Sequence, residues 1–528
     1  MTNFNRKAFR KRLSLPSRIV LHRIVLLLIL SCSLLLVACS ETPTSIPNPL
    51  TIPAGLNPAP TETTPADATA VTPTQSGQPG TASADAAAVT PTQNSQPDSS
   101  GSGSSSNSST RTTPTPVGQD QRLVLTLWTS GWKGNPDYEK FLNSLIDTYR
   151  SKYFKNFTLD WQDFGNDLAA QLAETFTKNP KAVPDLVLLS PGDLYQFAAD
   201  NKLEELAILV GTEGQNRFSP PAWEAMRYSS GDNSGTYGLP WVASTRVSII
   251  NKKLWQTATL DPAKLPKNFD ELDQYLTQMR DYTPSDVRSV WLHPDPVADF
   301  MMEDTPLYQL NAEGKKEAAF NVGAAQGKWQ YYFNRRRDGY FTPEALDGTY
   351  KDALNRYAGG KLVMVMDGAP LLPGLKTQNP DLYNNTLVTL HPLSKANMLP
   401  LQIQGWAVPK MAVNKRDAVD FALFLDNDEN QLAFAKFLQV VIPTTKKDLT
   451  DPYVTSGDDL IAQSRAIMAR ALPQTRPPEQ LIPAPVPLAT RDKLLNALYI
   501  AQSAIWNKAV KPQDALAEAS KAWAELLK

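Results

Sequence analysis

The chain reads RLVLTLWTSGWKGNPDYEKFLNSLIDTYR from Arg122 to Arg150, and its two halves have different hydrophobic patterns. Arg122–Trp128 is an apolar run typical of a buried strand, and a Thr-Ser-Gly-Trp loop follows it. Asn135 then stands at the N-cap position and Pro136 at the first helical position. The stripe of an amphipathic helix, with its i, i+3, i+4, i+7, i+8 and i+11 spacing, is formed by Tyr138, Phe141, Leu142, Leu145, Ile146 and Tyr149.

The same alternation of strand and helix continues as far as Ala199. Phe157–Gln162 and Asp185–Leu189 have the pattern of strands, and Asp167–Thr177 and Gly192–Ala199 that of helices. Helices alternating with continuously apolar strands predict a parallel sheet that is covered on both faces. Ligands bind outside the carboxyl ends of the strands in such sheets. The loops that could contact a ligand are therefore residues 129–133, 163–165 and 190–193.

Length and charge exclude several classes of protein. The 528 residues are too many for one hydrophobic core, because single cores stop growing near ~250–300 residues. The whole chain has 52 basic and 53 acidic residues, but residues 1–38 carry seven Lys or Arg and no acid. The remainder has 45 basic and 53 acidic residues, a net charge of −8, and lacks the basic excess of nucleic-acid binders.

Cysteine and histidine are scarce. The two cysteines are Cys32 and Cys39, and the three histidines are His22, His293 and His391. These numbers exclude a disulfide framework and zinc sites built only from Cys and His. Metal sites or catalysis based on carboxylates remain open.

Residues 1–38 have the layout of an export signal. A basic stretch precedes the 15-residue apolar run Ile24–Ala38, which is short for the ~20 residues of a membrane-spanning helix. The run ends in Leu-Val-Ala-Cys39-Ser, which resembles the lipobox of bacterial lipoproteins. That resemblance implies cleavage before Cys39, diacylglycerol on its sulfur and a protein exported and anchored by lipid to the outer face of the cell membrane. The alternative is a plain membrane anchor with a chance cysteine.

Residues 39–120 are expected to form a disordered tether. From Ser40 to Asp120 there is no aromatic residue, and 13 of the 43 prolines lie there among Ser, Thr, Ala, Gln and Gly. Such a segment cannot bury enough apolar surface to offset its ordering entropy. Residues 66–79 recur as 84–97 with 11 of 14 positions identical, but the unit has no hydrophobic face that could stack. The folded body is expected at 121–528.

A series of motifs in the folded body is informative because of its order. It begins with Tyr237–Leu254 (YGLPWVASTRVSIINKKL) and with Asn268–Leu272, where Asn268 caps a helix. The later motifs are Gly359–Gly368 (GGKLVMVMDG), Gln404–Pro409, Arg416–Phe424, Glu429–Leu438 and Pro512–Leu516. In this order they resemble the extracellular solute-binding proteins of ABC importers, in the sugar-binding, maltodextrin-type group. The resemblance covers essentially residues 121–528.

The resemblance implies a periplasmic-binding-protein-like α/β fold with two lobes, three interlobe crossings and a ligand cleft between the lobes. Lobe one would be about 121–242 and 371–442, and lobe two 247–366 and 446–528. The protein would capture a small solute, a sugar or oligosaccharide, and deliver it to the ABC permease subunits in the membrane. It would be a monomer and not an enzyme, with no cofactor, metal or nucleic-acid partner.

A sugar site needs aromatic planes for the C–H faces of the ring and carboxylates for the hydroxyl groups. From their positions in loops and motifs we expect the ligand contacts to be Trp132, Asp163, Asp193, Trp241, Asp367, Gly368 and Trp406. The simpler explanations are packing for the tryptophans and helix-start charges for Asp163 and Asp193.

The chain departs from the maltodextrin-type pattern in two places. No Trp follows the Asp367-Gly-Ala-Pro sequence, and Tyr499 is only a rough match to the stacking aromatic of the C-terminal lobe. The identity of the solute is therefore left open.

Two other functions remain as alternatives. One is a tethered extracellular carbohydrate-active enzyme that uses two carboxylates, although no catalytic motif surrounds His293 or His391 and no phosphate-binding loop is present. The other is a receptor that presents its bound ligand to a membrane sensor.

Overall fold

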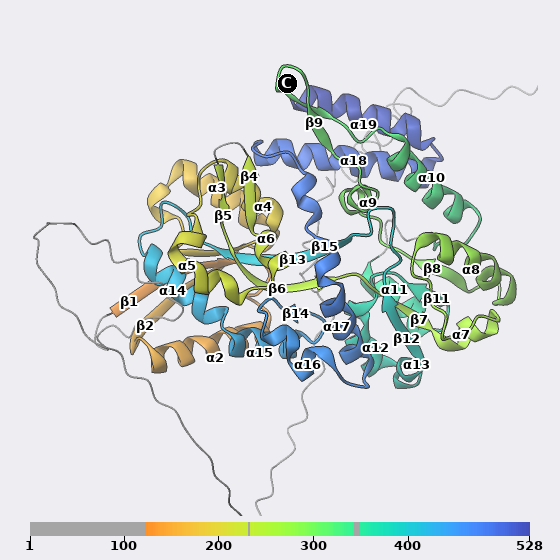
Figure 1. Cartoon of the computed structure of the whole chain (residues 1–528), viewed down its shortest axis with the longest axis horizontal. Coiled ribbons are helices and arrows are strands. Elements are labelled where there is room, and N and C mark those ends of the chain that lie inside the picture. Colours follow the sequence, from red (N-terminus) through yellow and green to blue (C-terminus); the bar gives the residue numbers. More distant parts are fainter. Residues whose placement is uncertain (1–121, 231–232, 343–348) are drawn as a thin grey trace, which may run out of the picture. The chain divides into compact units, whose positions relative to one another are not determined.

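A computed structural model describes residues 122–230, 233–342 and 349–528 (Figure 1). The expected leader, the cysteine at position 39 and the tether lie outside these residues. The described part contains two large β-sheets with helices packed on them. None of its helices is both long enough and apolar enough to cross a membrane.

The larger sheet has seven strands. They are β1 (Arg122–Thr129), β2 (Asn156–Asp163), β3 (Leu186–Leu189), β6 (Leu239–Thr245), β13 (Leu399–Ala407), β14 (Ile442–Pro443) and β15 (Thr475–Arg476). Their order is β14-β6-β13-β3-β1-β2, and β15 pairs with β13. β1 is parallel to β2 and β3, as the sequence predicts, whereas β13 is antiparallel to β3 and β6.

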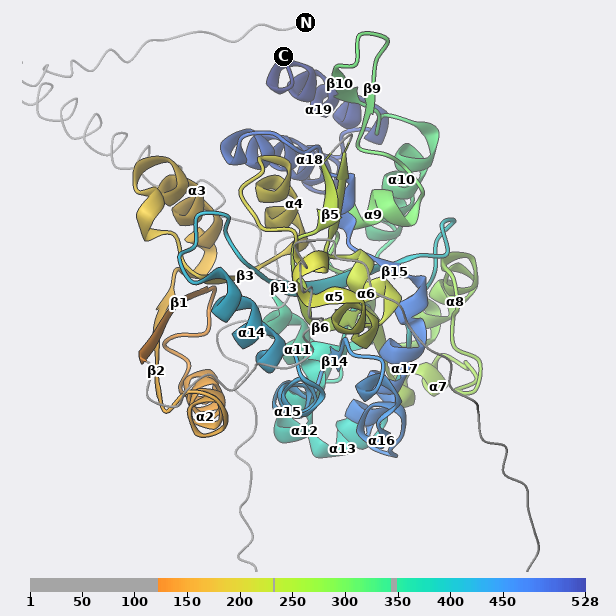
Figure 2. The same cartoon turned by 60° about the vertical axis from the view of Figure 1, so that its left-hand side comes forward.

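Helices cover both faces of this sheet (Figure 2). Successive strand residues point to opposite faces, so Leu186 and Leu188 join one core cluster while Val187 and Leu189 join another. The first cluster lies under α2 (Pro136–Lys152), α5 (Leu206–Arg217), α14 (Lys415–Leu425) and α15 (Asp428–Leu438). The second contains residues of α3 (Leu168–Lys178), α4 (Pro191–Ala199), α6 (Pro220–Glu224) and α17 (Leu460–Ala471).

The smaller sheet has four strands in the order β12-β7-β11-β8. They are β7 (Val247–Asn251), β8 (Arg288–Trp291), β11 (Leu362–Val365) and β12 (Thr386–Leu390). β7 is antiparallel to both β11 and β12, and β8 is parallel to β11. β8, β11 and β12 therefore run in one direction.

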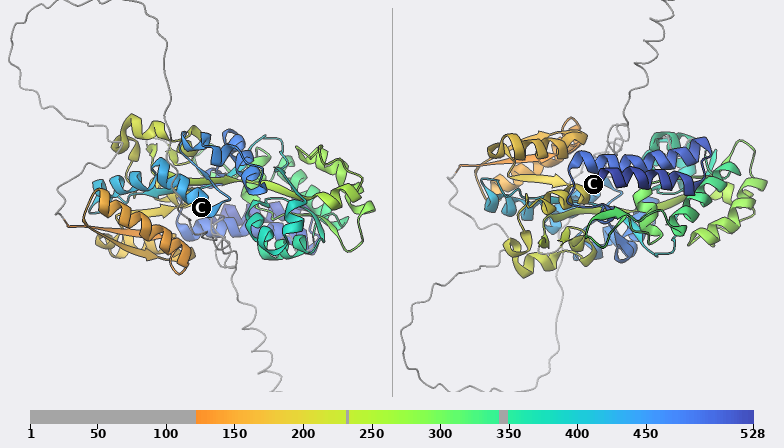
Figure 3. Two further views of the ribbon diagram at one scale, coloured as in Figure 1. Left: turned by 90° about the horizontal axis from the view of Figure 1, so that it is seen from below. Right: turned by 90° about the horizontal axis from the view of Figure 1, so that it is seen from above.

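Most of the helices that accompany the smaller sheet come from two separate parts of the chain, and α17 also packs on β12. The helices of these two parts are α7 (Lys252–Thr257), α8 (Phe269–Tyr282), α9 (Pro296–Met302), α10 (Gly323–Arg337), α11 (Tyr350–Ala358), α12 (Leu372–Gln378), α13 (Pro380–Asn384), α18 (Leu488–Lys508) and α19 (Pro512–Leu526). α18 and α19 lie side by side (Figure 3). They are joined by a 2.8 Å hydrogen bond from Trp523 Nε1 to the Leu494 carbonyl.

Besides short 3-10 turns, the described residues also form two hairpins and one short α-helix. They are β4 (Arg227–Ser230) with β5 (Asn233–Thr236), β9 (Tyr308–Leu310) with β10 (Lys316–Ala318), and α16 (Pro452–Thr455).

The chain passes between the two sheets in the middle of the sequence. Arg246 is the single residue between β6 and β7, and it lies between the expected end of the first segment of lobe one at 242 and the expected start of lobe two at 247. β12 pairs with β7 over five residues, so residues 386–390 belong to the smaller sheet, although the expected boundaries put 371–442 in the lobe of the first strands. An apolar strand pattern does not tell which sheet the strand joins. The chain returns to the larger sheet along residues 391–398, before β13.

Candidate functional site

Arg246 lies where the edges of both sheets meet. β6 runs in the same direction as β3, because both are antiparallel to β13. The carboxyl end of β6, Thr245, is therefore on the carboxyl edge of the larger sheet. β7 runs against β11 and β12, so its first residue, Val247, is on the carboxyl edge of the smaller sheet. Arg246 thus belongs to both of the edges at which α/β sheets bind ligands.

The loop after β11 brings a carboxylate to this point. Asp367 has a φ of 60°, a left-handed conformation that Asp tolerates better than most residues. The Gly368 N–H donates to the Val247 carbonyl at 2.6 Å, and a Cβ on Gly368 would lie 2.5 Å from Ile249 Cγ1. The close approach of β7 therefore requires glycine after Asp367. The Tyr350 hydroxyl donates to Asp367 Oδ2 at 2.8 Å.

The Arg246 guanidinium is buried, and two of its three nitrogen atoms lack a hydrogen-bond partner among the described residues. The residue is 5% exposed, and Nε and Nη1 have no hydrogen-bond partner among the described residues. Its Nε atom lies 4.0 Å from Asp367 Oδ2. Burial lowers the pKa of Arg246, and the charges of Asp367, Asp295 and Asp299 outweigh that effect and raise it. The charges of all three carboxylates therefore act on the guanidinium.

The edge of the larger sheet contributes Asp193 at the start of α4. Ser190 caps this helix, and its hydroxyl donates to Asp193 Oδ2 at 2.8 Å. Arg491, on α18, places Nη1 2.6 Å from Asp193 Oδ1. Arg491, which lies 298 positions later in the sequence, thus holds the Asp193 carboxylate in place.

Glu479 connects the two edges. It lies in a 3-10 turn, Pro478–Leu481, that touches both α4 and α9. A Cβ on Gly192 would lie 3.2 Å from Glu479 Cγ, so the side chain rests on the start of α4. Burial raises the pKa of Glu479 to about 7, and the charges of Asp295 and Asp193 add to the rise.

Tyr499 on α18 is influenced by the charges of the same acids. Burial raises the pKa of its hydroxyl well above the usual value, and Asp295, Asp299 and Glu479 contribute. We name the whole set the junction cluster: Asp193, Arg246, Asp295, Asp299, Tyr350, Asp367, Glu479, Arg491 and Tyr499. Its carboxylates accept hydrogen bonds, its guanidinium groups donate them and its phenols do both.

The segment 391–398, which leads back to β13, is fixed beside this cluster. Lys328 Nζ donates to Ser394 Oγ at 2.7 Å and lies 3.2 Å from the centroid of the Phe269 ring. The His391 N–H donates to the Arg246 carbonyl at 3.3 Å. Burial lowers the pKa of both Lys328 and His391. The two connections between the sheets, at Arg246 and at residues 391–398, are thus held to each other, and the second is also bound to α10.

Comparison with known proteins decides the family. The model of the bacterial extracellular solute-binding protein family matches residues 144–459. The chain belongs to this family. No curated protein gives a significant match. Family membership indicates an exported binding protein.

Solved structures of solute-binding proteins have the same fold. A putative oligosaccharide periplasmic-binding protein from Synechococcus sp. MITs9220 has 22% identity over 76% of this chain and 98% of its own, with a TM-score of 0.63. The sugar-binding protein MalE from Xanthomonas citri has 15% identity, covers 77% and 97%, and has a TM-score of 0.62. A solute-binding protein from Thermotoga lettingae, bound with α-D-tagatose, has 21% identity, covers 77% and 100%, and has a TM-score of 0.58. The expected periplasmic-binding-protein-like fold with two lobes is confirmed.

The residues that the sequence analysis named as ligand contacts lie in three different places in the structure. Asp193 and Asp367 are in the junction cluster, and Gly368 packs beside it against Ile249. Asp163 instead accepts hydrogen bonds from Thr129 Oγ1 and from four backbone N–H groups: those of Gly131, Trp132, Lys133 and Gly165. Its role in this solute-binding protein is to order the loop after β1.

The three tryptophans lie in the hydrophobic core, and we correct the expectation that they face the solute. Trp132, Trp241 and Trp406 are 6%, 1% and 0% exposed. Phe434 of α15 packs on Trp132 and Trp241, with ring centroids 5.3 and 4.9 Å apart, and Trp241 contacts Trp406 at 5.6 Å. Neighbouring rings therefore cover the indole faces that a sugar would need.

Sequence reasoning missed most of the junction cluster. Arg246 had a usable signal, because it is the one charged residue in the run from Tyr237 to Asn251. Asp295 also had one, since it lies in His-Pro-Asp-Pro directly after a strand that ends at Trp291. Glu479 and Arg491 had no signal in the sequence that could have identified them. Tertiary contacts alone bring them to the edge.

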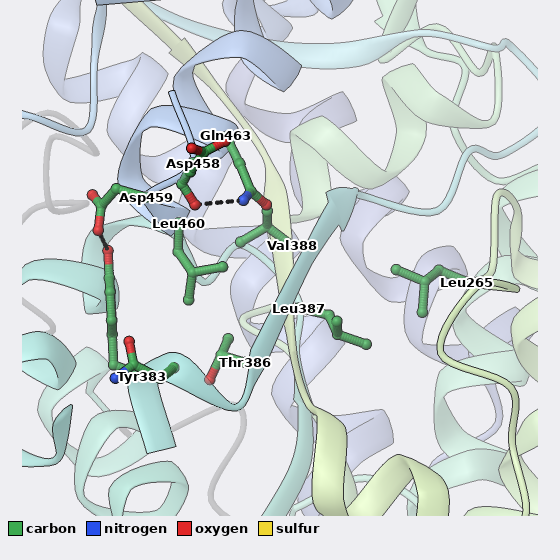
Figure 4. Close-up of a pocket in the computed structure, with 10 residues that line it drawn as sticks. Leu265, Tyr383, Thr386, Leu387, Val388, Asp458, Asp459, Leu460 and Gln463 are labelled. Atoms are coloured by element: carbon green, nitrogen blue, oxygen red, sulfur yellow. Dashed lines mark hydrogen bonds between the residues drawn. The ribbon is translucent and has the colours of Figure 1, made fainter. Parts of the chain in front are cut away.

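A separate cavity of about 320 Å³ lies at the other edge of the smaller sheet (Figure 4). Its wall is formed by Leu265, Tyr383, Asn384, Thr386, Leu387, Val388, Asp458, Asp459, Leu460 and Gln463. The first residues of β12 are part of this wall, so the cavity is not at the carboxyl ends of the strands. Tyr383 donates to Asp459 at 2.6 Å and Gln463 to the Asp458 carbonyl at 2.8 Å.

No group of three or more His, Cys, Asp or Glu in the described ranges could hold a metal ion.

Proposed function

We propose that the chain is a lipid-anchored solute-binding protein that captures a sugar or oligosaccharide outside the cytoplasm and delivers it to an ABC importer. The observation that carries the proposal is the junction cluster, which lies on the edge shared by the two sheets in a member of the solute-binding family. A ligand that contacts both edges would favour the arrangement in which they are close together.

The chemistry of the cluster supports a polyhydroxy ligand. Carboxylates such as Asp367 accept hydroxyl hydrogens, and the unpartnered Arg246 N–H groups can donate to ring or hydroxyl oxygens. Solved structures with this fold include proteins bound with tagatose and with maltotetraose. We propose binding without chemical conversion, by a monomer, with the permease as the partner.

We also propose the domain organisation that the sequence predicts. Residues 1–38 would be the leader, Cys39 the lipidated residue, 39–120 the tether and 121–528 the solute-binding domain, whose lobes meet at Arg246. Two or three acyl chains would hold the mature protein stably at the membrane.

A thermal-shift screen of the purified protein against mono- and oligosaccharides tests the function. A solute at a hundredfold excess over its Kd stabilises the folded state by about 2.7 kcal/mol. We expect at least one sugar to raise the melting temperature in a saturable manner. If no sugar does so at millimolar concentration, the sugar assignment fails.

A further inference from the structure

The aromatic rings in the loops at the carboxyl edges of the two sheets differ in how far neighbouring side chains cover them. Among the described residues of these loops, Trp132 and His391 are buried, and Phe164 packs on Trp128 with ring centroids 4.5 Å apart. His293, which follows β8, is exposed. A sugar ring needs an aromatic plane that other side chains leave open, and in these described loops His293 meets that need.

His293 is the exposed member of a group of three rings. β8 ends at Trp291, which is fully buried. The His293 imidazole stacks on the Trp291 indole, with ring centroids 6.0 Å apart and an interplanar angle of 18°. Tyr350, at the start of α11, places its ring 5.4 Å from Trp291 and 6.3 Å from His293. Two neighbouring rings thus hold the imidazole at the carboxyl end of β8.

Tyr350 also links this group of rings to the polar side chains of the junction cluster. Its hydroxyl donates to Asp367 Oδ2 at 2.8 Å, and the same carboxylate oxygen lies 4.0 Å from Arg246 Nε. Arg246 Nε and Nη1 still lack an acceptor among the described residues. An aromatic plane and hydrogen-bonding groups are therefore adjacent. A sugar ring has both matching surfaces, because C–H groups form its faces and hydroxyl groups its rim.

We propose that His293 is the stacking residue of the solute site: its imidazole contacts the C–H face of a sugar ring whose hydroxyl groups bind Asp367 and Arg246. This inference rests on the proposed function and deepens it, because it assigns the aromatic plane that the buried tryptophans do not supply. It also narrows the solute to a cyclic sugar, since an open-chain polyol has similar hydroxyl groups but no ring face. Aromatic side chains are prominent among the few residues that carry most of the binding energy of a site.

Calorimetric titration of the purified full chain tests the inference. The probes are glucose, maltose, maltotetraose, tagatose and any further sugar found in the thermal-shift screen, with glucitol as the open-chain polyol. The sugar that binds the parent most tightly is then titrated into two variants. His293→Phe keeps an aromatic plane but has no ring nitrogen, whereas His293→Gln keeps hydrogen-bonding groups but has no ring.

The two variants distinguish stacking from a role in hydrogen bonding. We expect the conservative variant His293→Phe to bind within about threefold of the parent, and His293→Gln to bind at least about tenfold more weakly. A histidine that only held its loop by hydrogen bonds would give the reverse order. Melting temperatures of the unliganded variants verify that both are folded.

The matched control is Tyr282→Ala, which removes another exposed ring. Tyr282 is the last residue of α8, and β8 begins after it, so it lies at the opposite edge of the smaller sheet. The affinity of this variant should stay within about twofold of the parent.

The outcomes separate this inference from the proposed function. Unchanged affinity in His293→Gln, or an equal loss in His293→Phe and His293→Gln, overturns the stacking role and leaves sugar binding intact. Tighter binding of glucitol than of every cyclic sugar also overturns the inference. If no sugar binds the parent, the proposed function fails and the inference fails with it.

Discussion

Arg491 Nη1 lies 2.6 Å from Asp193 Oδ1, and the two residues are separated by 298 positions in the sequence. Their side chains are 14% and 22% exposed, so solvent screens this ion pair less than a surface pair. Through it, α18 near the end of the chain holds the start of α4 beside the larger sheet. The position of one acid of the junction cluster thus depends on the C-terminal helices.

This relationship predicts strong energetic coupling between the two side chains. A double-mutant cycle with Asp193→Asn and Arg491→Gln, measured by chemical denaturation, should give an interaction energy of about 1–3 kcal/mol. The matched control is the exposed pair Glu525 and Lys528, for which we expect less than about 0.5 kcal/mol. Equal coupling in both cycles would show that the buried pair has no special role.

The aromatic core predicts what happens when Trp241 is truncated. Trp241→Ala would leave a cavity against Phe434 and Trp406 and should lower the free energy of unfolding by about 3–5 kcal/mol. Folded Trp241→Ala protein should still bind solute within about threefold of the parent, as measured by titration below its melting temperature. A large loss of affinity with little loss of stability would show that the Trp241 indole contacts the solute and would contradict its assignment to the core.

Glu479 predicts a pH-dependent stability. Burial raises the pKa of Glu479 to about 7, above the ~4.3 of an unfolded chain. The native state then binds more protons than the unfolded state between these values, so this group lowers stability as pH rises from about 4.3 to 7. Glu479→Gln should therefore melt higher than the parent at pH 8 and at nearly the same temperature at pH 4.5. A difference that does not change with pH would refute this explanation.

Cys39 predicts the mode of membrane attachment. It is the only cysteine that would remain after cleavage at the expected site, so Cys39→Ala should abolish metabolic labelling with a radiolabelled fatty acid. Cys32→Ala serves as the control and should leave labelling unchanged. Persistent lipid label on the Cys39→Ala protein would contradict the lipoprotein assignment.

The fold could be predicted from the sequence largely because local patterns carry it. The strand expected at Phe157–Gln162 is β2, with one more residue at each end, and Asn135 caps α2 with its side chain as expected. The membership of β12 could not be predicted, because its five residues carry no signal that distinguishes one sheet from the other. Only its pairing with β7 settles the matter.

The site was harder to predict because it is built from long-range contacts. Asp193 was predicted from its place in the loop after a strand, and Asp367 from the motif that resembles the solute-binding family; that they contact a ligand stays a prediction. The tryptophans occupy similar positions in the sequence, but Phe434, some 190–300 residues later in the chain, covers Trp132 and Trp241. A position in a polar loop, as for Trp132, does not reveal such a cover.

The most direct test of the central claim is a calorimetric titration of the solute that raises the melting temperature most. The parent should bind one molecule per chain. Asp367→Asn, in which Asn tolerates the same left-handed backbone, should bind at least tenfold more weakly, a loss of about 1.4 kcal/mol. Gln463→Ala, in the wall of the separate cavity, should bind within about twofold of the parent. Unchanged affinity in Asp367→Asn together with loss of binding in Gln463→Ala would place the site in that cavity and contradict the account.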